Sequence, residues 1–123
     1  CDAVDSGAEE IVCWGTGTPK REFLNVDDFA DVAYELFRMH DDPEILNIGS
    51  SEEVSIRELA ETVAECAGYR GAIRWDSAKP DGIPRKLLDS SRLHAVSSWR
   101  PRIALKEGIR SMIADYRAGR AVR

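Results

Sequence analysis

The chain has 123 residues, of which 43% are hydrophobic and 32% charged, and its net charge is −5. This composition is typical of a folded globular protein and excludes an intrinsically disordered chain. No apolar run approaches the roughly 20 residues that cross a bilayer, and the sequence shows no signal-peptide core, so no membrane partner is expected. At this length we expect one domain.

The negative net charge conceals two unlike parts of the chain. Residues 1–84 contain 7 basic and 19 acidic residues, whereas residues 85–123 contain 10 basic and 3 acidic residues. The basic part could attract phosphates or an acidic protein surface, or it could lie on solvated helix faces. Nucleic acid is disfavoured as a partner, because the total charge is negative and no aromatic residues alternate with the basic ones.

The cysteines and histidines indicate neither disulfides nor a metal site. Cys1, Cys13 and Cys66 are odd in number and lack a C-x-x-C spacing, which predicts reduced thiols in a cytoplasmic protein. His40 and His94 have no partners at metal-ligand spacing. We therefore expect no bound metal.

The first predicted elements are two strands around a turn. Residues 11–15 and 22–26 are apolar or alternating and predict strands. Gly15, Gly17 and Pro19 lie between them and predict a tight turn.

A helix is predicted over residues 27–39, with either Asn25 or Asp27 as its N-cap. A short apolar strand is predicted next, over residues 45–50. The apolar residues of the helix recur at helical spacing, and they are Phe29, Val32, Ala33, Leu36 and Phe37.

The best-defined helix start lies in the middle of the chain. Ser55 followed by Glu58 forms a capping-box pattern, and Gly68 predicts the end of that helix. Residues 72–76 suit a strand, and an amphipathic helix is predicted from Leu105 to near Gly119. The alternation predicts an α/β chain with about three helices.

The familiar phosphate-binding and catalytic motifs do not match. The Gly15-Thr-Gly turn has no following Gly-Lys-Ser/Thr, so it is not a P-loop. It also lacks the third glycine of a dinucleotide fingerprint. No tyrosine is followed by lysine at the fourth position. We therefore expect no catalytic residues and no cofactor-binding residues in this chain.

Two stretches point to a polar, anionic ligand: Trp14-Gly-Thr-Gly-Thr-Pro-Lys-Arg-Glu-Phe-Leu-Asn-Val-Asp-Asp28 and Lys79-Pro-Asp-Gly-Ile-Pro-Arg-Lys-Leu-Leu-Asp89. Each places an aromatic or charged group beside a turn stiffened by glycine and proline. Arginine offers a planar fork for phosphate oxygens, lysine a compact charge, and tryptophan a flat face for a base or sugar. Taken singly, Trp14 could equally be a core residue and Lys86 a surface charge.

These two stretches, with Leu46-Asn-Ile-Gly49 and Ser55-Ile-Arg-Glu-Leu-Ala60, resemble the GDP-L-fucose synthases. This family belongs to the extended short-chain dehydrogenase/reductase superfamily. Its members epimerise GDP-4-keto-6-deoxy-D-mannose and reduce it with NADPH to GDP-L-fucose. The resemblance covers essentially the whole chain in family order. The second stretch is the more specific of the two.

The resemblance implies a substrate-binding portion without the Rossmann half. Trp14, Arg21, Asp81 and Lys86 match family contacts to the GDP-sugar, with Lys86 near the pyrophosphate and Asp81 accepting from a hydroxyl or base donor. The NADP site, the catalytic serine and the Tyr-x-x-x-Lys pair belong to a half expected upstream. Residues 1–123 are accordingly expected to form a single partial domain, with a small mixed sheet and about three helices.

Two interpretations stay open. In the first, the chain is a GDP-sugar recognition piece of an epimerase/reductase, and it works only with the missing half. In the second, it is a free-standing binding or assembly module without enzymatic activity. The first residue is Cys1 rather than methionine, which indicates a processed product or a segment of a longer protein. The resemblance implies that residues 45–50 and the helix after Asp28 pack onto the nucleotide-binding sheet, so apolar faces would be uncovered without it, and the expected partner is either a second copy of the chain (a homo-oligomer) or the missing half.

Overall fold

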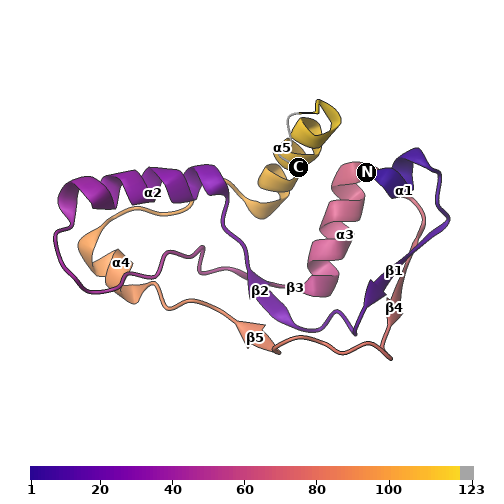
Figure 1. Ribbon diagram of the computed structural model, residues 1–123, viewed down its shortest axis with the longest axis horizontal. Helices are drawn as coiled ribbons and strands as arrows, with labels where there is room; N and C mark the ends of the chain where they lie inside the picture. Colours follow the sequence, from indigo (N-terminus) through magenta and orange to yellow (C-terminus); the bar gives the residue numbers. More distant parts are fainter. Residues whose placement is uncertain (120–123) are drawn as a thin grey trace.

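The structure is a computed structural model that describes residues 1–119 (Figure 1). Within that range it contains five helices and five short strands in two small sheets. The predicted α/β class with a small mixed sheet is therefore confirmed. The two helices beyond the expected three are α1 (Asp2–Asp5) and α4 (Ser91–Val96). Both have fewer than two turns, which is too short for an apolar periodicity to be visible in the sequence.

The first sheet has two parallel strands, β1 (Glu10–Trp14) and β4 (Ala72–Asp76). Their register runs from Glu10 opposite Ala72 to Trp14 opposite Asp76. Both strands were predicted within one residue. The sheet places the end of β1, where Trp14 lies, beside the start of the 77–84 loop.

The second sheet has the order β3–β2–β5, with bounds Glu53–Ser55, Lys20–Glu22 and Arg85–Lys86. β2 runs antiparallel to β3 and parallel to β5. The predicted strand over 22–26 is wrong beyond its first residue, because a helix already begins at Val26. β3 and β5 were missed because runs of two or three residues carry no readable alternation.

The predicted strand over 45–50 is also wrong. Within residues 1–119 this segment pairs with no other strand, and Ile45 is 81% exposed. A strand is held by hydrogen bonds to a neighbouring strand, so an apolar run alone does not make one. The segment lacks a strand partner in the described part of the chain, although the Asn47 side chain donates to the Asp89 carbonyl at 3.1 Å.

Helix α2 (Val26–Met39) is tied to the segment before α5 (Leu105–Arg117) by a buried carboxylate. Asn25, one of the two proposed caps, accepts a hydrogen bond from the N–H of Asp27 at 2.8 Å. Asp28 is only 1% exposed, and it accepts from the backbone N–H groups of Arg102 at 3.1 Å and Ile103 at 2.9 Å. Asp28 thus fixes the approach of the chain to α5.

Helix α3 (Ile56–Ala67) begins with the predicted capping box and ends at Gly68, whose φ is +77°. It packs against α5. Lys106 on α5 donates to Glu65 at 2.6 Å, and Arg117 donates to the Ala67 carbonyl at 3.0 Å. These contacts hold the C-terminal end of α3 against α5, whereas its N-terminus follows β3 directly and binds the turn between β1 and β2.

The buried core of the described chain is small, and α2 carries an uncovered apolar stripe. The stripe recurs at helical spacing and consists of the exposed Val26, Phe29, Ala30 and Phe37, together with the half-buried Ala33. Phe37 is 87% exposed, whereas Val32 on another side of the helix is fully buried. Figure 1 shows α2 set apart from the first sheet. The helix is amphipathic, yet only part of its apolar surface is covered within residues 1–119.

Candidate functional site

The turn between β1 and β2 is held in one conformation by two glycines. Gly15 and Gly17 have φ values of +80° and +76°, a region that favours glycine, and both are buried. A Cβ on Gly17 would lie 2.7 Å from the Trp75 ring, so that ring requires a glycine here. The predicted turn is confirmed, and its backbone packs against β4.

The carbonyl groups of this turn face the N-terminus of α3. The N–H groups of Ile56 and Arg57 donate to the carbonyls of Pro19 and Gly17, each at 2.9 Å. The Arg57 side chain donates to the Thr16 carbonyl at 2.6 Å. The first N–H groups of a helix have no partner within the helix, and here the turn supplies two acceptors for them.

The second sequence stretch meets the first at Asp81. Its carboxylate accepts from the Thr16 N–H at 2.8 Å and from the Thr16 hydroxyl at 2.6 Å. The Thr16 hydroxyl, followed by its backbone N–H, lowers the pKa of Asp81 below its ordinary value. Asp81 therefore joins the 79–84 loop to the 15–19 turn.

Trp14 is not a core residue. Its side chain lies at the end of β1 and is 72% exposed. The Lys79 ammonium lies 5.4 Å from the centre of its ring, within the range of a cation–π contact. Because the indole is exposed, its flat face is accessible to a ligand, as it would not be if Trp14 were buried in the core.

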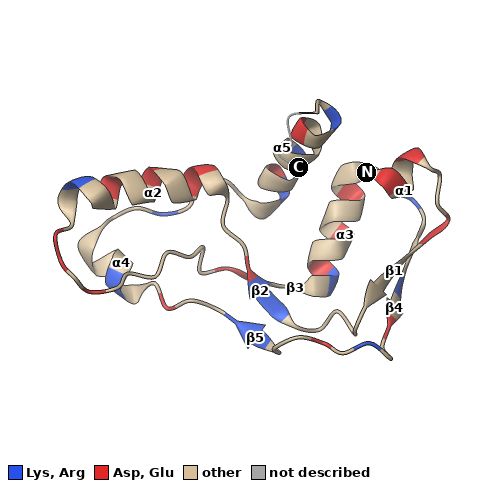
Figure 2. Ribbon diagram, viewed as in Figure 1, with Lys and Arg blue, Asp and Glu red and all other residues tan. Residues whose placement is uncertain are grey.

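Arg21 and Lys86 lie directly opposite each other in the parallel pair of β2 and β5. Residues opposite each other in a sheet project to the same face, so both charges lie on one side. Lys20 and Arg85 are the next pair along and project to the other face, where Arg85 binds Glu53 at 2.6 Å. Figure 2 shows β2 and β5 as a basic region of the chain.

We call the four predicted residues Trp14, Arg21, Asp81 and Lys86 the two-loop site. Trp14, Arg21 and Asp81 line one cavity of about 140 Å³. Lys86 does not line it, but it is paired with Arg21. Drug-sized ligands occupy roughly 300–1,000 Å³, so this cavity is too small to enclose one. The residues that line it form one open wall at the surface of the described chain.

Sequence reasoning missed three residues that shape this wall. Thr16 binds Asp81, Arg57 binds the turn, and Lys79 covers part of Trp14. Each of them lies within a stretch already singled out by the resemblance. The resemblance therefore covered these three residues, but their spacing in the sequence did not indicate which side chains would be in contact.

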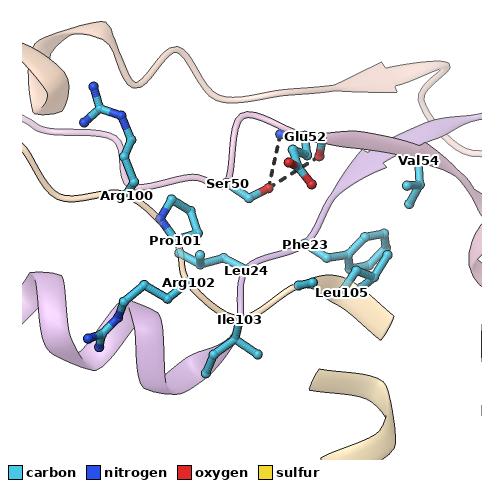
Figure 3. Close-up of a pocket in the computed structure, with 11 residues that line it drawn as sticks. Phe23, Leu24, Ser50, Glu52, Val54, Arg100, Pro101, Arg102, Ile103 and Leu105 are labelled. Carbon is cyan, nitrogen blue, oxygen red and sulfur yellow. Dashed lines mark hydrogen bonds between the residues drawn. The ribbon is translucent and has the colours of Figure 1, made fainter. Parts of the chain in front are cut away.

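A second cavity, of about 360 Å³, lies between the end of β2 and the segment before α5 (Figure 3). Its lining includes the apolar side chains of Phe23 and Leu105 and contains none of the predicted site residues. Arg100 and Arg102 border it, but their guanidinium groups point away from Phe23 and Leu105 (Figure 3). Arg102 forms its ion pair with Asp31 instead. This cavity has no charge directed into it from these arginines.

Two further features of residues 1–119 bear on function. No group of three or more histidine, cysteine or acidic side chains is arranged to hold a metal ion in this range. None of the helices described is long and apolar enough to cross a membrane.

Comparisons with known proteins identify relatives of this chain. Residues 2–49 match the NAD dependent epimerase/dehydratase family. GDP-L-fucose synthase 1 of Arabidopsis thaliana is 52% identical over 108 residues, which is 88% of this chain and 33% of the plant protein. The GDP-L-fucose synthase of Escherichia coli K12 is 42% identical over 119 residues, covering 89% of this chain and 37% of that protein.

Solved structures show the same arrangement of elements. A GDP-6-OMe-4-keto-L-xylo-heptose reductase from Campylobacter jejuni superposes with a TM-score of 0.80 at 31% identity, covering 90% of this chain and 34% of the reductase. RMD from Pseudomonas aeruginosa, complexed with NADPH, superposes with a TM-score of 0.83 at 25% identity, covering 95% and 39%.

The chain belongs to the extended short-chain dehydrogenase/reductase superfamily, as a segment of a protein of the epimerase/dehydratase type. Within that class, its sequence corresponds to part of the GDP-L-fucose synthases, as the resemblance indicated. The chain spans about a third of the length of the relatives it matches.

Proposed function

We propose that this chain is the GDP-sugar recognition part of a GDP-L-fucose synthase-like, NADP-dependent epimerase/reductase. The observation that carries the proposal is the pair of hydrogen bonds between Asp81 and Thr16. They hold together the two sequence stretches, 14–28 and 79–89, that bear the predicted contacts. Arg21 and Lys86 then stand side by side on one sheet face, with the exposed indole of Trp14 near Arg21 at the same cavity.

The proposed roles follow from the chemistry of each side chain. Arg21 and Lys86 bind the pyrophosphate, because two adjacent cations match two adjacent phosphates. Trp14 stacks on the base or the sugar. Asp81 accepts from a ligand hydroxyl or base N–H with the lone pairs left free by Thr16, since each carboxylate oxygen can accept more than one hydrogen bond.

The chain alone is not catalytically competent under this proposal. Hydride transfer is the chemistry of a nicotinamide cofactor, and we assign no residue of this chain to NADP or to catalysis. The proposed partner is the nucleotide-binding part of the same kind of enzyme. The uncovered stripe on α2 and the unpaired 45–50 segment suit an additional sheet, which would pair with the segment and cover Phe29 and Phe37.

The alternative is a free-standing, oligomeric binding or assembly module without enzymatic activity. The same exposed stripe favours it, because a second copy of the chain could cover Phe37 as well. The two functions differ in one measurement. Adding a separately produced nucleotide-binding portion of a homologous synthase should restore NADPH oxidation only under the first. NADPH oxidation by the chain alone should be zero under both, and turnover would contradict both.

Calorimetric titration with GDP and GDP-mannose at low salt tests the recognition site. We expect weak binding that weakens further as salt is added, because the contacts are charged and exposed. The Arg21→Ala/Lys86→Ala variant should lose about tenfold or more in affinity, since one charge-assisted hydrogen bond is worth about 1.5–3 kcal/mol.

The matched control is Lys20→Ala/Arg85→Ala, which removes one lysine and one arginine from the same two strands but from the opposite face. Its affinity should stay within about twofold of the parent chain on geometric grounds. No binding by the parent chain at millimolar GDP would refute the proposal. Equal losses in the two double variants would show that net charge matters and the two-loop site does not.

A further inference from the structure

We propose that Arg57 is the positioning residue of the two-loop site. It fixes the conformation of the 15–19 turn, and this conformation determines the relative positions of Trp14 and Arg21. The inference rests on the proposed function, because it assigns a role within that same site. Arg57 belongs to α3, so it lies outside both sequence stretches that bear the predicted contacts.

Arg57 donates two hydrogen bonds to the turn. Its side chain donates to the Thr16 carbonyl at 2.6 Å, and its backbone N–H donates to the Gly17 carbonyl at 2.9 Å. Two successive peptide groups are thereby oriented by one residue. Because a peptide group is planar, fixing each carbonyl also fixes the N–H on its other side.

The guanidinium is itself held in place by an aromatic ring. Its central carbon lies 4.7 Å from the centre of the Trp75 ring, and that ring also packs against Gly17. Arg57, Trp75 and the turn therefore form one packed unit. A planar guanidinium can stack on a ring and donate sideways at once, whereas a lysine ammonium lacks that planar fork.

Two oppositely charged side chains bind Thr16. The Arg57 guanidinium donates to the Thr16 carbonyl, whereas the Asp81 carboxylate accepts from the Thr16 N–H and hydroxyl. Trp14 precedes this residue by two positions, and Arg21 follows it by five. The turn joins the strands that carry both contacts, so its conformation decides their separation and direction.

Arg57 acts through these neighbours and does not bind the ligand. It is not among the residues that line the cavity of Trp14, Arg21 and Asp81. Its side chain is already engaged by a carbonyl and a ring. The ligand's phosphates therefore meet Arg21 and Lys86, and losing Arg57 should change the geometry of the site without removing a phosphate contact.

The test compares Arg57→Ala and Arg57→Lys with Arg70→Ala, a matched exposed arginine just beyond α3. Amide hydrogen exchange of Gly17 and Thr18 is measured in the ligand-free chain, together with GDP affinity at several salt concentrations. Both Arg57 variants should exchange about tenfold faster or more at these amides and bind GDP about five- to tenfold more weakly. Arg70→Ala should change neither quantity.

The salt dependence separates positioning from direct contact. The remaining affinity of the Arg57 variants should fall with salt as steeply as that of the parent chain, whereas Arg21→Ala should flatten the dependence. Rescue of GDP affinity by Arg57→Lys would overturn the inference, because a charge alone would then suffice. Unchanged exchange, or faster exchange with unchanged GDP affinity, would also overturn it.

The two proposals can fail separately. If the parent chain does not bind GDP at millimolar concentration, the recognition proposal fails, and the positioning role fails with it. If the parent chain binds GDP and the Arg57 variants bind it equally well, only the positioning role is wrong. Should Arg57→Ala not fold, Arg57→Lys keeps the stem and the charge and provides the same comparison.

Discussion

Asp81 and Thr16 are 65 positions apart, yet the carboxylate of one accepts both the N–H and the hydroxyl of the other, at 2.8 and 2.6 Å. This contact turns two separate stretches of sequence into one structural unit. A Cβ on Gly15 would collide with the same carboxylate, so the turn has room for Asp81 only because that residue is glycine. The proposed recognition role depends on this contact, because it ties the middle of the 79–84 loop to the turn that follows Trp14.

The contact between Asp81 and Thr16 should be lost in acid. The pKa of Asp81 is lowered below its ordinary 3.8, mainly because the Thr16 hydroxyl and N–H donate to the ionised carboxylate. A depressed folded-state pKa gives stability that is present above the unfolded value and lost as pH falls through the folded value. The loops should therefore stay joined at pH 5–7, and the contact should be lost only as pH falls through the lowered pKa of Asp81.

Nuclear magnetic resonance can follow the Thr16 amide from pH 7 to pH 2.5. We expect one transition, with its midpoint below 3.8, and its disappearance in Asp81→Asn. A transition centred above 3.8 in the parent chain would contradict the lowered pKa. A transition that persists in Asp81→Asn would show that another carboxyl group causes it.

Replacing Asp28 with alanine should be costly for the fold. The buried carboxylate accepts from the N–H groups of Arg102 and Ile103, and removing it leaves both donors without that partner. An unsatisfied buried group costs about 1–3 kcal/mol, so we expect a loss of about 2–4 kcal/mol in the free energy of unfolding, measured in urea. Asp27→Ala is the control, because Asp27 is exposed and adjacent. Similar losses in the two variants would contradict the assigned role of Asp28.

The capping box of α3 gives a smaller and more local prediction. The Glu58 N–H donates to the Ser55 hydroxyl at 3.1 Å, while the Glu58 carboxylate accepts from the Ser55 N–H at 2.7 Å. Ser55→Ala should lower the free energy of unfolding by about 1 kcal/mol, as is usual for an N-cap. Ser55→Thr, which keeps the hydroxyl that accepts from the Glu58 N–H and donates to the Glu58 carboxylate, should recover most of that loss. Equal losses for alanine and threonine would show that Ser55 acts in β3 rather than as a cap.

The helices could be predicted from the sequence because their signals are local. Asn25, Ser55 and Gly68 mark helix ends through contacts with residues two to four positions away. The apolar residues of α2 and α5 recur at helical spacing over more than three turns. These patterns needed no knowledge of distant parts of the chain.

The strands and the site were harder because they depend on distant partners. Residues 45–50 form an apolar run as suitable as that of β1, but β1 has β4 beside it, and the 45–50 segment pairs with no strand within residues 1–119. The exposure of Trp14 likewise depends on how its strand packs. The resemblance supplied the residue types of the site, whereas the contacts of Thr16 and Arg57 required the fold.

The uncovered stripe of α2 should make the isolated chain associate with itself. Phe37 and Val26 are 87% and 72% exposed and lie on one side of the helix, and contiguous apolar surface of this kind usually marks an interface. We expect light scattering at micromolar concentration to show a dimer or larger oligomer. Phe37→Asp should shift the population towards monomer, because association would then bury a charge.

Met112→Asp on α5 is the matched control, since Met112 is 70% exposed but belongs to a different helix. If association uses α2, the aspartate on α5 should leave the oligomer intact. A stable monomer of the parent chain would refute self-association and favour a partner of different sequence for α2. Dissociation by Met112→Asp but not by Phe37→Asp would place the interface on α5, and the stripe of α2 would then stay available to the proposed nucleotide-binding part.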